Sequence, residues 1–149
     1  MASRDMARYA AMQPYFDVVA DGLRGLVDGN DFFDLHADDV VVEYIITVPN
    51  YPHMVVGRDA LADLYADYGD SIVQSGSSDV HRYHDAVQSV VILEYTMHGK
   101  LVQTGAPYVN RFISVITVKD RKISHWRDYL DPLAVFAAFG ESAPPGAVD

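Results

Sequence analysis

The chain has 149 residues, of which 50% are hydrophobic and 21% are charged, and its formal net charge is −10 at pH 7. This length and composition indicate one globular domain, and the acidic excess disfavours nucleic acid and anionic membranes as partners. The absence of cysteine excludes disulfides, thiolate metal sites and cysteine nucleophiles. The sequence shows no export signal and no apolar run long enough to cross a bilayer, so we expect a cytoplasmic protein.

Helical patterns dominate the first half of the chain. Apolar residues recur every three or four positions over residues 12–27, which predicts an amphipathic helix, and residues 31–35 are typical of a short helical turn. A second amphipathic helix is expected after Gly57. Its apolar face comprises Leu61, Leu64, Tyr65, Tyr68 and Ile72. We expect this helix to end in a loop over residues 74–78, which are rich in serine and glycine.

Strand patterns dominate the second half, after one earlier β-branched strand predicted at residues 40–46. The further strands are predicted at residues 80–85, 89–98, 108–119 and 122–130, with turns at 99–100, 105–107 and 120–121. Residues 132–139 predict a last short helix, and residues 141–149 a disordered tail.

Helices followed by a series of strands predict a single α+β domain over residues 1–140. In this architecture the N-terminal helices pack on one face of a curved antiparallel sheet. The bend that lets the sheet cover the helices leaves a cavity between the layers, where a small-molecule ligand would bind.

The last predicted strand carries the strongest candidate for catalysis. Strand alternation places Trp126, Asp128 and Leu130 on one face, and the two apolar side chains mark that face as the buried one. A carboxylate between them loses water, which raises its pKa and suits it for proton transfer near neutral pH. The alternative is that Asp128 belongs to a solvated ion-pair edge with Arg127 and Asp131.

Other polar and aromatic side chains are predicted to line a substrate site beside this aspartate. They are Tyr15, Tyr44, Glu94, Asn110 and Trp126. Tyr15 and Tyr44 can donate hydrogen bonds to a developing oxyanion, with plain core packing as the alternative for both. Glu94 can pair with Asp128 so that their pKa values separate, with a salt bridge to Arg111 as the alternative.

The register of the last hairpin stays open at this point. A two-residue turn at positions 120–121 sets Asp128 opposite Ile113, whereas a bulge would bring Phe112 or Ser114 across. Six histidines raise the question of a metal, but His81 and His84, which are close in sequence, point to opposite faces of a strand. We therefore predict no metal site, and no cofactor, because no glycine-rich phosphate loop is present.

The stretch VKDRKISHWRDY at residues 118–129 resembles the closing hairpin of SnoaL-like and ketosteroid-isomerase-like proteins of the NTF2-like superfamily, which has a cystatin-like fold. FDLHADDV at residues 33–40 and VGRDAL at residues 56–61 extend the resemblance over most of the chain. The resemblance implies a cone-shaped domain with helices packed on a curved sheet, and a cofactor-free enzyme that acts on small molecules.

Within this superfamily, the run WRDY at residues 126–129 is similar to segments of limonene epoxide hydrolase and of SnoaL polyketide cyclases. The resemblance implies that Asp128 activates water, or acts as acid or base. Phenazine-biosynthesis proteins of the PhzA and PhzB type are also similar and carry glutamate there. Ser114 stands where the cyclases place a histidine and ketosteroid isomerase its proton-donating aspartate, and the isomerase's base aligns near Tyr44. These departures keep any one member's chemistry from being transferred directly.

Two hypotheses follow. The first is a cofactor-free enzyme that uses Asp128 as general acid or base on a small apolar or cyclic substrate, by isomerisation, cyclisation, dehydration or epoxide hydrolysis. The second is a non-catalytic small-molecule binding protein or dimerising accessory protein of the same fold. The sheet face that carries Val91, Leu93 and Tyr95, or their alternates, is expected to be exposed and suggests a homodimer.

Overall fold

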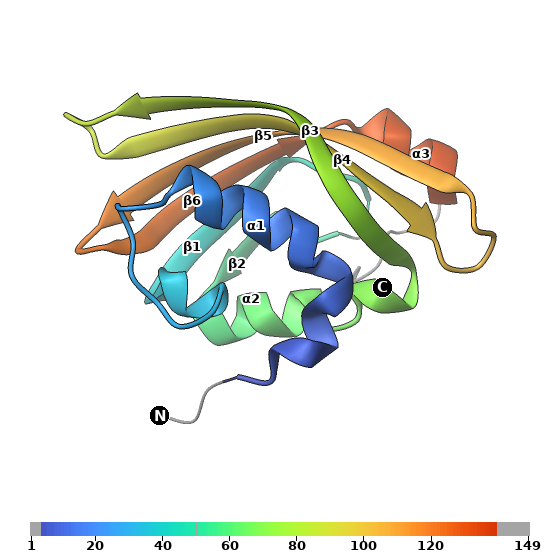
Figure 1. Cartoon of the computed structure of the whole chain (residues 1–149), viewed down its shortest axis with the longest axis horizontal. Coiled ribbons are helices and arrows are strands. Elements are labelled where there is room, and N and C mark those ends of the chain that lie inside the picture. Colours follow the sequence, from blue (N-terminus) through green and yellow to red (C-terminus); the bar gives the residue numbers. More distant parts are fainter. Residues whose placement is uncertain (1–3, 50, 140–149) are drawn as a thin grey trace.

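The computed structural model describes residues 4–49 and 51–139, in which helices cover one face of a curved six-stranded sheet (Figure 1). The strands are β1 (His36–Ile46), β2 (Met54–Val56), β3 (Ile72–Asp85), β4 (Val90–Leu101), β5 (Pro107–Lys119) and β6 (Lys122–Leu130). The helical segments are η1 (Met6–Met12), α1 (Gln13–Gly22), η2 (Phe33–Leu35), α2 (Arg58–Tyr65), η3 (Tyr68–Asp70) and α3 (Pro132–Phe139). The α+β fold class predicted from the sequence is confirmed.

The strand order across the sheet is β2-β1-β6-β5-β4-β3. All neighbouring strands are antiparallel except β1 and β6, which run parallel. The sheet is therefore mixed, where the sequence predicted an antiparallel one. The parallel pair arises because the chain leaves β1 for β2 and α2, builds the β3, β4 and β5 meander, and only then returns beside β1.

Several helices and strands begin or end at other residues than the sequence predicts. Residues 74–78, expected as a loop, lie in β3 and pair with β4. Burial alternates along this serine- and glycine-rich segment, so one side faces the interior although no large apolar residue marks it. The long first helix is shorter than predicted, because a 3₁₀ segment precedes α1 and the helix ends at Gly22. Strand β2 was not predicted, and the predicted tail at 141–149 lies outside the described residues.

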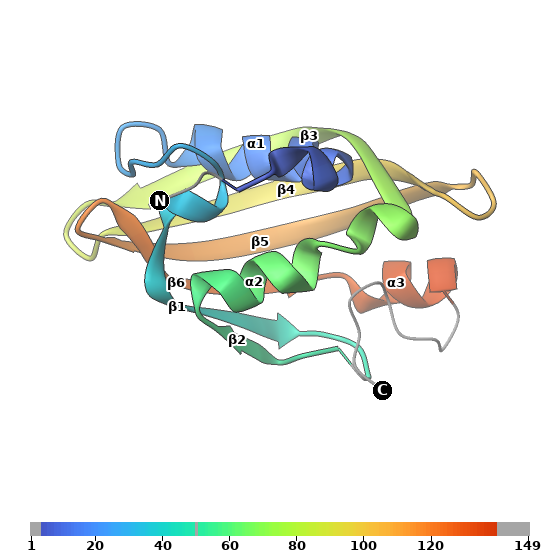
Figure 2. The same ribbon diagram turned by 90° about the horizontal axis from the view of Figure 1, so that it is seen from below.

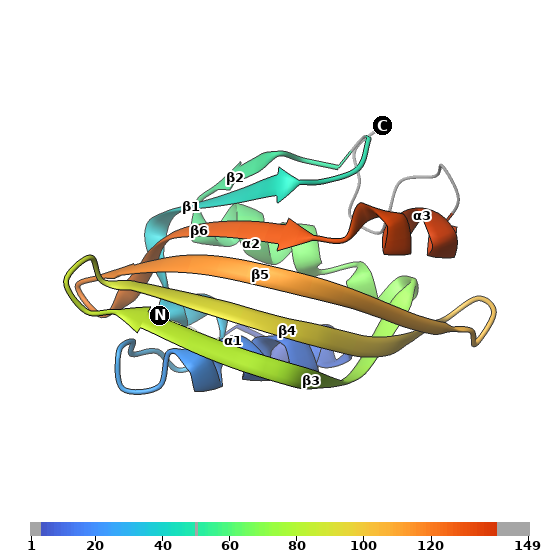
Figure 3. The same ribbon diagram turned by 90° about the horizontal axis from the view of Figure 1, so that it is seen from above.

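Helices α1 and α2 lie on the same side of the sheet and leave its other face open (Figures 2 and 3). Helix α1 contacts β3 and β4, whereas α2 contacts β1 near the other edge. The core between the layers is rich in aromatic and branched aliphatic side chains. Its largest fully buried members include Tyr9, Phe16, Phe33, Leu93, Ile116 and Trp126.

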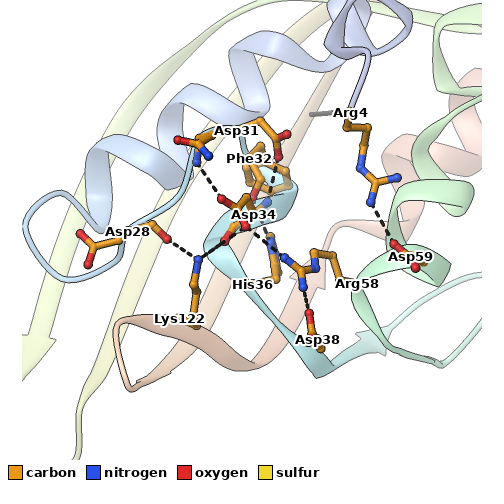
Figure 4. Close-up of polar contacts among 11 residues, drawn as sticks. Arg4, Asp28, Asp31, Phe32, Asp34, His36, Asp38, Arg58, Asp59 and Lys122 are labelled. Carbon is orange, nitrogen blue, oxygen red and sulfur yellow. Dashed lines mark hydrogen bonds and ion pairs between the residues drawn. The ribbon is translucent and has the colours of Figure 1, made fainter. Parts of the chain in front are cut away.

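A polar network fixes the turn that leads into β1 (Figure 4). The Lys122 ammonium donates to the backbone oxygens of Asp28 at 2.7 Å and Asp34 at 2.6 Å. Arg58 of α2 pairs with the carboxylates of Asp34, at 3.1 Å, and Asp38. The network ties the η2 turn to the start of β6 and to α2, and so fixes the segment from which β1 enters the core.

Replacing Lys122 tests this anchor. Lys122→Met leaves two backbone oxygens without their donor, so we expect the free energy of unfolding to fall by about 1 to 2 kcal/mol. The exposed Lys119 lies on the same hairpin, and Lys119→Met serves as the control, with an expected change within about 0.5 kcal/mol. Urea unfolding monitored by circular dichroism measures both, and an equal loss in the two variants would contradict the anchoring role.

Candidate functional site

Asp128 and Trp126 point from β6 into the space between the layers. Their exposed fractions are 2% and 1%, whereas Arg127 between them is exposed on the other face of the sheet. The inward orientation inferred from strand alternation is therefore confirmed, and Asp128 does not belong to a solvated ion-pair edge.

The β5–β6 hairpin determines which residue lies across from Asp128. Its turn residues Asp120 and Arg121 both have positive φ angles, 53° and 62°, as a two-residue type I′ hairpin turn requires. A register shift beyond Thr117 leaves Ser124 as the extra residue on β6, so that Ser114 pairs with Asp128. Of the two registers left open by the sequence, the bulged one is present.

Three donors surround the carboxylate. Oδ1 accepts hydrogen bonds from the Ser114 hydroxyl at 2.6 Å and from the Trp126 indole N–H at 3.0 Å. Oδ2 accepts a longer one, at 3.4 Å, from the hydroxyl of Tyr15 on α1. Oδ1 is therefore firmly held, and Oδ2 is the oxygen that remains free to exchange a proton or bind a ligand.

Burial raises the pKa of Asp128 from its ordinary value to about 6, because the charged form has lost its water. The hydrogen bonds from Ser114, Trp126 and Tyr15 favour the charged form and oppose this rise without cancelling it. Both protonation states are therefore accessible close to neutral pH, as a general acid or base requires.

A cavity of about 60 Å³ opens beside Asp128 between the helices and the sheet. This volume is several times what one water molecule needs. Its wall is rich in aromatic side chains: Tyr15 comes from α1, Tyr44 from β1, Tyr65 from α2 and Phe112 from β5. A small, largely apolar ligand fits such a space with Asp128 at its wall.

The tyrosines of the cavity bond to one another. The hydroxyls of Tyr44 and Tyr65 lie 2.9 Å apart, and those of Tyr51 and Tyr68 form a second pair. Burial raises the pKa of all four phenols, and of Tyr15, above the ordinary value. They are therefore neutral hydrogen-bond donors at neutral pH.

The structure brings only some of the predicted binding residues to the cavity. Tyr15 and Tyr44 line it, and Trp126 contacts Asp128 from behind the lining. Asn110 is buried, but its side-chain oxygen accepts from the backbone N–H groups of Arg111 and Asp131 and so fixes the end of β6. Its amide nitrogen donates to the hydroxyl of the cavity-lining Tyr108 at 3.0 Å, so Asn110 acts from behind the cavity wall.

Glu94 lies away from Asp128. The neighbouring Tyr95 faces the core and bonds Ser114 at 2.8 Å, so alternation along β4 places Glu94 on the open face of the sheet. The predicted pairing of Glu94 with Asp128 is therefore wrong. The alternative salt bridge between Glu94 and Arg111 is likewise not found among the described residues. Val91 and Leu93 are also buried, so the residues between them on β4, and not these two, lie on the open face of the sheet.

Sequence reasoning missed the part played by Ser114 and by Tyr65. The sequence places Ser114 opposite Asp128 in one of the registers it leaves open, but it gives no sign that the Ser114 hydroxyl holds the carboxylate. Tyr65 belongs to the apolar face of the predicted helix and was assigned to the core. Its position next to the pocket depends on how α2 packs against β1, which the periodicity of the helix does not reveal.

Across residues 4–49 and 51–139, no group of three or more histidine, aspartate or glutamate side chains is arranged to hold a metal ion. The helices of this same stretch include none that is long and apolar enough to cross a membrane.

The fold and the buried pocket carboxylate define an α+β domain of the NTF2-like class. The chain belongs to the SnoaL-like domain family, whose model matches residues 13–126. It is 33% identical over 115 residues to the uncharacterized protein YesE of Bacillus subtilis strain 168. The aligned region covers 77% of this chain and 78% of that protein.

Solved structures show the same fold. The crystal structure of a candidate isomerase from Bacillus subtilis is similar with a TM-score of 0.72 and 28% identity, covering 93% of this chain and 91% of that one. A phenazine biosynthesis-related protein, PhzB2, from Pseudomonas aeruginosa is similar with a TM-score of 0.65 and 17% identity, covering 97% and 90%.

Removing the Ser114 hydroxyl tests its hold on the carboxylate. Because Ser114 donates to the charged form, we expect Ser114→Ala to raise the pKa of Asp128 further above about 6. Trp126 is the single tryptophan of the chain and contacts Asp128, so its fluorescence against pH reports the titration. Ser77→Ala, at an exposed serine of β3, is the control. An unchanged midpoint in Ser114→Ala would contradict the assignment.

The raised pKa also predicts a pH-dependent stability. The folded state binds the Asp128 proton more tightly than the unfolded chain, so its contribution is present at low pH and is lost as pH rises from about 4 to about 6. Two pKa units correspond to about 3 kcal/mol. We expect Asp128→Asn to gain about that much stability relative to wild type between about pH 4 and pH 7, as measured by urea unfolding. Glu94→Gln, which removes a carboxylate from the open face, should track wild type.

Proposed function

We propose that this protein is a cofactor-free enzyme of the isomerase or cyclase type, with Asp128 as general acid or base on a small apolar or cyclic substrate. The observation that carries the proposal is a buried carboxylate, with a pKa of about 6, at the wall of an aromatic cavity. Membership of the SnoaL-like family supports it, as does the likeness to a candidate isomerase at 28% identity.

The chemistry starts with Oδ2 of the ionised carboxylate. It removes a proton from a carbon next to a carbonyl group: the C–H bond breaks, an O–H bond forms on Asp128, and the electron pair moves to the carbonyl oxygen. Returning the proton to another carbon isomerises the molecule. Attack of the enolate carbon on a second carbonyl carbon of the same molecule closes a ring instead: a C–C bond forms, the C=O π pair moves to that oxygen, and Asp128 returns its proton there.

The surroundings favour this proton transfer. Ser114 and Trp126 hold Oδ1 and so fix the direction of Oδ2. The neutral hydroxyl of Tyr15 is only loosely bonded to Oδ2, at 3.4 Å, and is free to turn to a substrate oxygen on which negative charge develops. The apolar wall excludes water and strengthens both effects.

A second candidate function is ligand binding without catalysis. The observation that favours it is Ser114, whose hydroxyl is occupied by Asp128 and Tyr95, where related enzymes carry an acid or a histidine. The homodimer, the cytoplasmic location and the lack of nucleic-acid partners stay predictions from the sequence.

Activity of the Asp128→Asn variant tests the proposed function. A β,γ-unsaturated cyclohexenone is a suitable first substrate, because its isomerisation to the conjugated enone is followed by ultraviolet absorbance. The variant should lose about 10³-fold in kcat/KM, and wild-type kcat/KM should rise with pH and level off above about 6. Glu94→Gln should keep wild-type rates. Turnover that persists in Asp128→Asn would refute the role of this carboxylate, and cyclic ketones that bind without turnover would favour the second candidate.

A further inference from the structure

The cavity has one formal charge in its lining, and that charge is negative. Asp128 is the single carboxylate among the described lining residues, which include no lysine or arginine. The lining histidine, His98, bonds the Ser78 hydroxyl through its ring Nε2 at 2.7 Å. A bound ligand therefore meets one carboxylate and no lysine or arginine among the described lining residues.

The carboxylate has unused hydrogen-bonding capacity on the oxygen nearer Tyr15. Each carboxylate oxygen has two lone-pair directions, and both on Oδ1 are occupied by Ser114 and Trp126. Oδ2 has one donor, at 3.4 Å, close to the limit of a hydrogen bond. A charged group in the interior is costly unless it is paired, so Asp128 lacks the partner that would stabilise its ionised form.

The rest of the wall suits a cation better than an anion. Six tyrosines line the cavity, and four of them bond in pairs, Tyr44 with Tyr65 and Tyr51 with Tyr68. Each pair uses one hydroxyl hydrogen internally, which reduces the donors left for an anion. Tyrosine rings carry negative charge on their faces and attract alkylammonium groups, most strongly where water is excluded.

We infer that the natural ligand carries a small alkylammonium group, which forms an ion pair with Asp128 inside the tyrosine-lined cavity. The inference rests on the proposed function for the location of the ligand, and it adds the chemical class. A positive group beside the carboxylate supplies the partner that the protein does not provide, and the rings surround its alkyl substituents, while Oδ2 keeps a lone pair for the proton transfer of the proposed function.

Ion pairing gives the binding a defined pH dependence. The titratable groups packed against Asp128 are phenols held neutral by burial, so they add no charge near neutral pH. They are Tyr15 from α1, Tyr44 from β1, Tyr65 from α2 and Tyr95 from β4, and β5 contributes the uncharged Ser114. A cation binds the ionised carboxylate, so its affinity should fall about tenfold per pH unit below the pKa of about 6.

A pair of isosteric probes tests the inference. Choline carries a quaternary nitrogen, and the neutral alcohol dimethylbutanol has the same shape with a quaternary carbon in its place. Both are titrated into wild-type protein, and binding is followed by fluorescence of Trp126, the single tryptophan, excited where tyrosine does not absorb. We expect choline to bind at least about tenfold more tightly than the alcohol at pH 8 and to lose this advantage at pH 5.

Two variants make the result specific to the site. Asp128→Asn should remove the preference for choline, and Glu94→Gln, which deletes a carboxylate from the open face of the same sheet, should keep it. Equal affinity for the two probes, tighter binding of the alcohol, no signal from either at millimolar concentration, or a preference that survives in Asp128→Asn would each overturn the inference.

The outcomes separate this inference from the proposed function. If choline fails while Asp128→Asn abolishes ketone isomerisation, the ligand class is wrong and the catalytic proposal stands. If choline binds as expected while Asp128→Asn leaves turnover unchanged, the binding site stands and the catalytic proposal falls.

Discussion

The desolvation of one carboxylate, opposed by hydrogen bonds on one of its oxygens, is the constraint on which the site depends. Ser114 and Trp126 donate to Oδ1 of Asp128 strongly enough for the charge to exist inside the protein, yet burial still raises its pKa to about 6. More donors would make the group an inert structural anion, and fewer would keep it protonated. The fold must therefore place both donors within hydrogen-bonding distance of the same oxygen.

That placement comes from backbone geometry as much as from side-chain chemistry. Without the extra residue Ser124 on β6, Asp128 would lie opposite Ile113 and not opposite Ser114, whose hydroxyl donates to Oδ1. The turn residue Arg121 helps hold this hairpin, because its guanidinium pairs with Asp28 at 2.5 Å in the loop that follows α1. The bulge in β6 thus decides whether the buried acid has Ser114 as a donor.

The sequence predicted the inward side of β6, because Trp126 and Leu130 on one face and Arg127 on the other leave little choice. It does not settle β4, where Ile92 and Leu93 are both apolar, and so it leaves open whether Glu94 faces Asp128 or the open side of the sheet. Nor does composition identify residues 74–78 as a strand, because their small side chains do not alternate between apolar and polar. Hydrogen bonding to β4 makes this segment a strand. The resemblance to SnoaL-like proteins predicts the fold. The hydrogen bond from Ser114 to Asp128 depends on the register of the β5–β6 hairpin, which the sequence does not determine.

Asp128 accepts a hydrogen bond from Trp126, and Trp126 is stacked on a second buried titratable group, His36. His36 gives the stability a pH dependence of opposite sign to that of Asp128. His36 lies parallel to Trp126, with ring centroids 5.8 Å apart, and the same indole donates to Asp128. Burial lowers the pKa of His36 to about 4, so the folded state holds its proton less tightly and this contribution is lost as pH falls from about 6.5. The contribution of Asp128 is lost as pH rises over nearly the same range. The two slopes have opposite sign, so between about pH 4 and pH 6 each buried group opposes the pH dependence that the other gives to the stability.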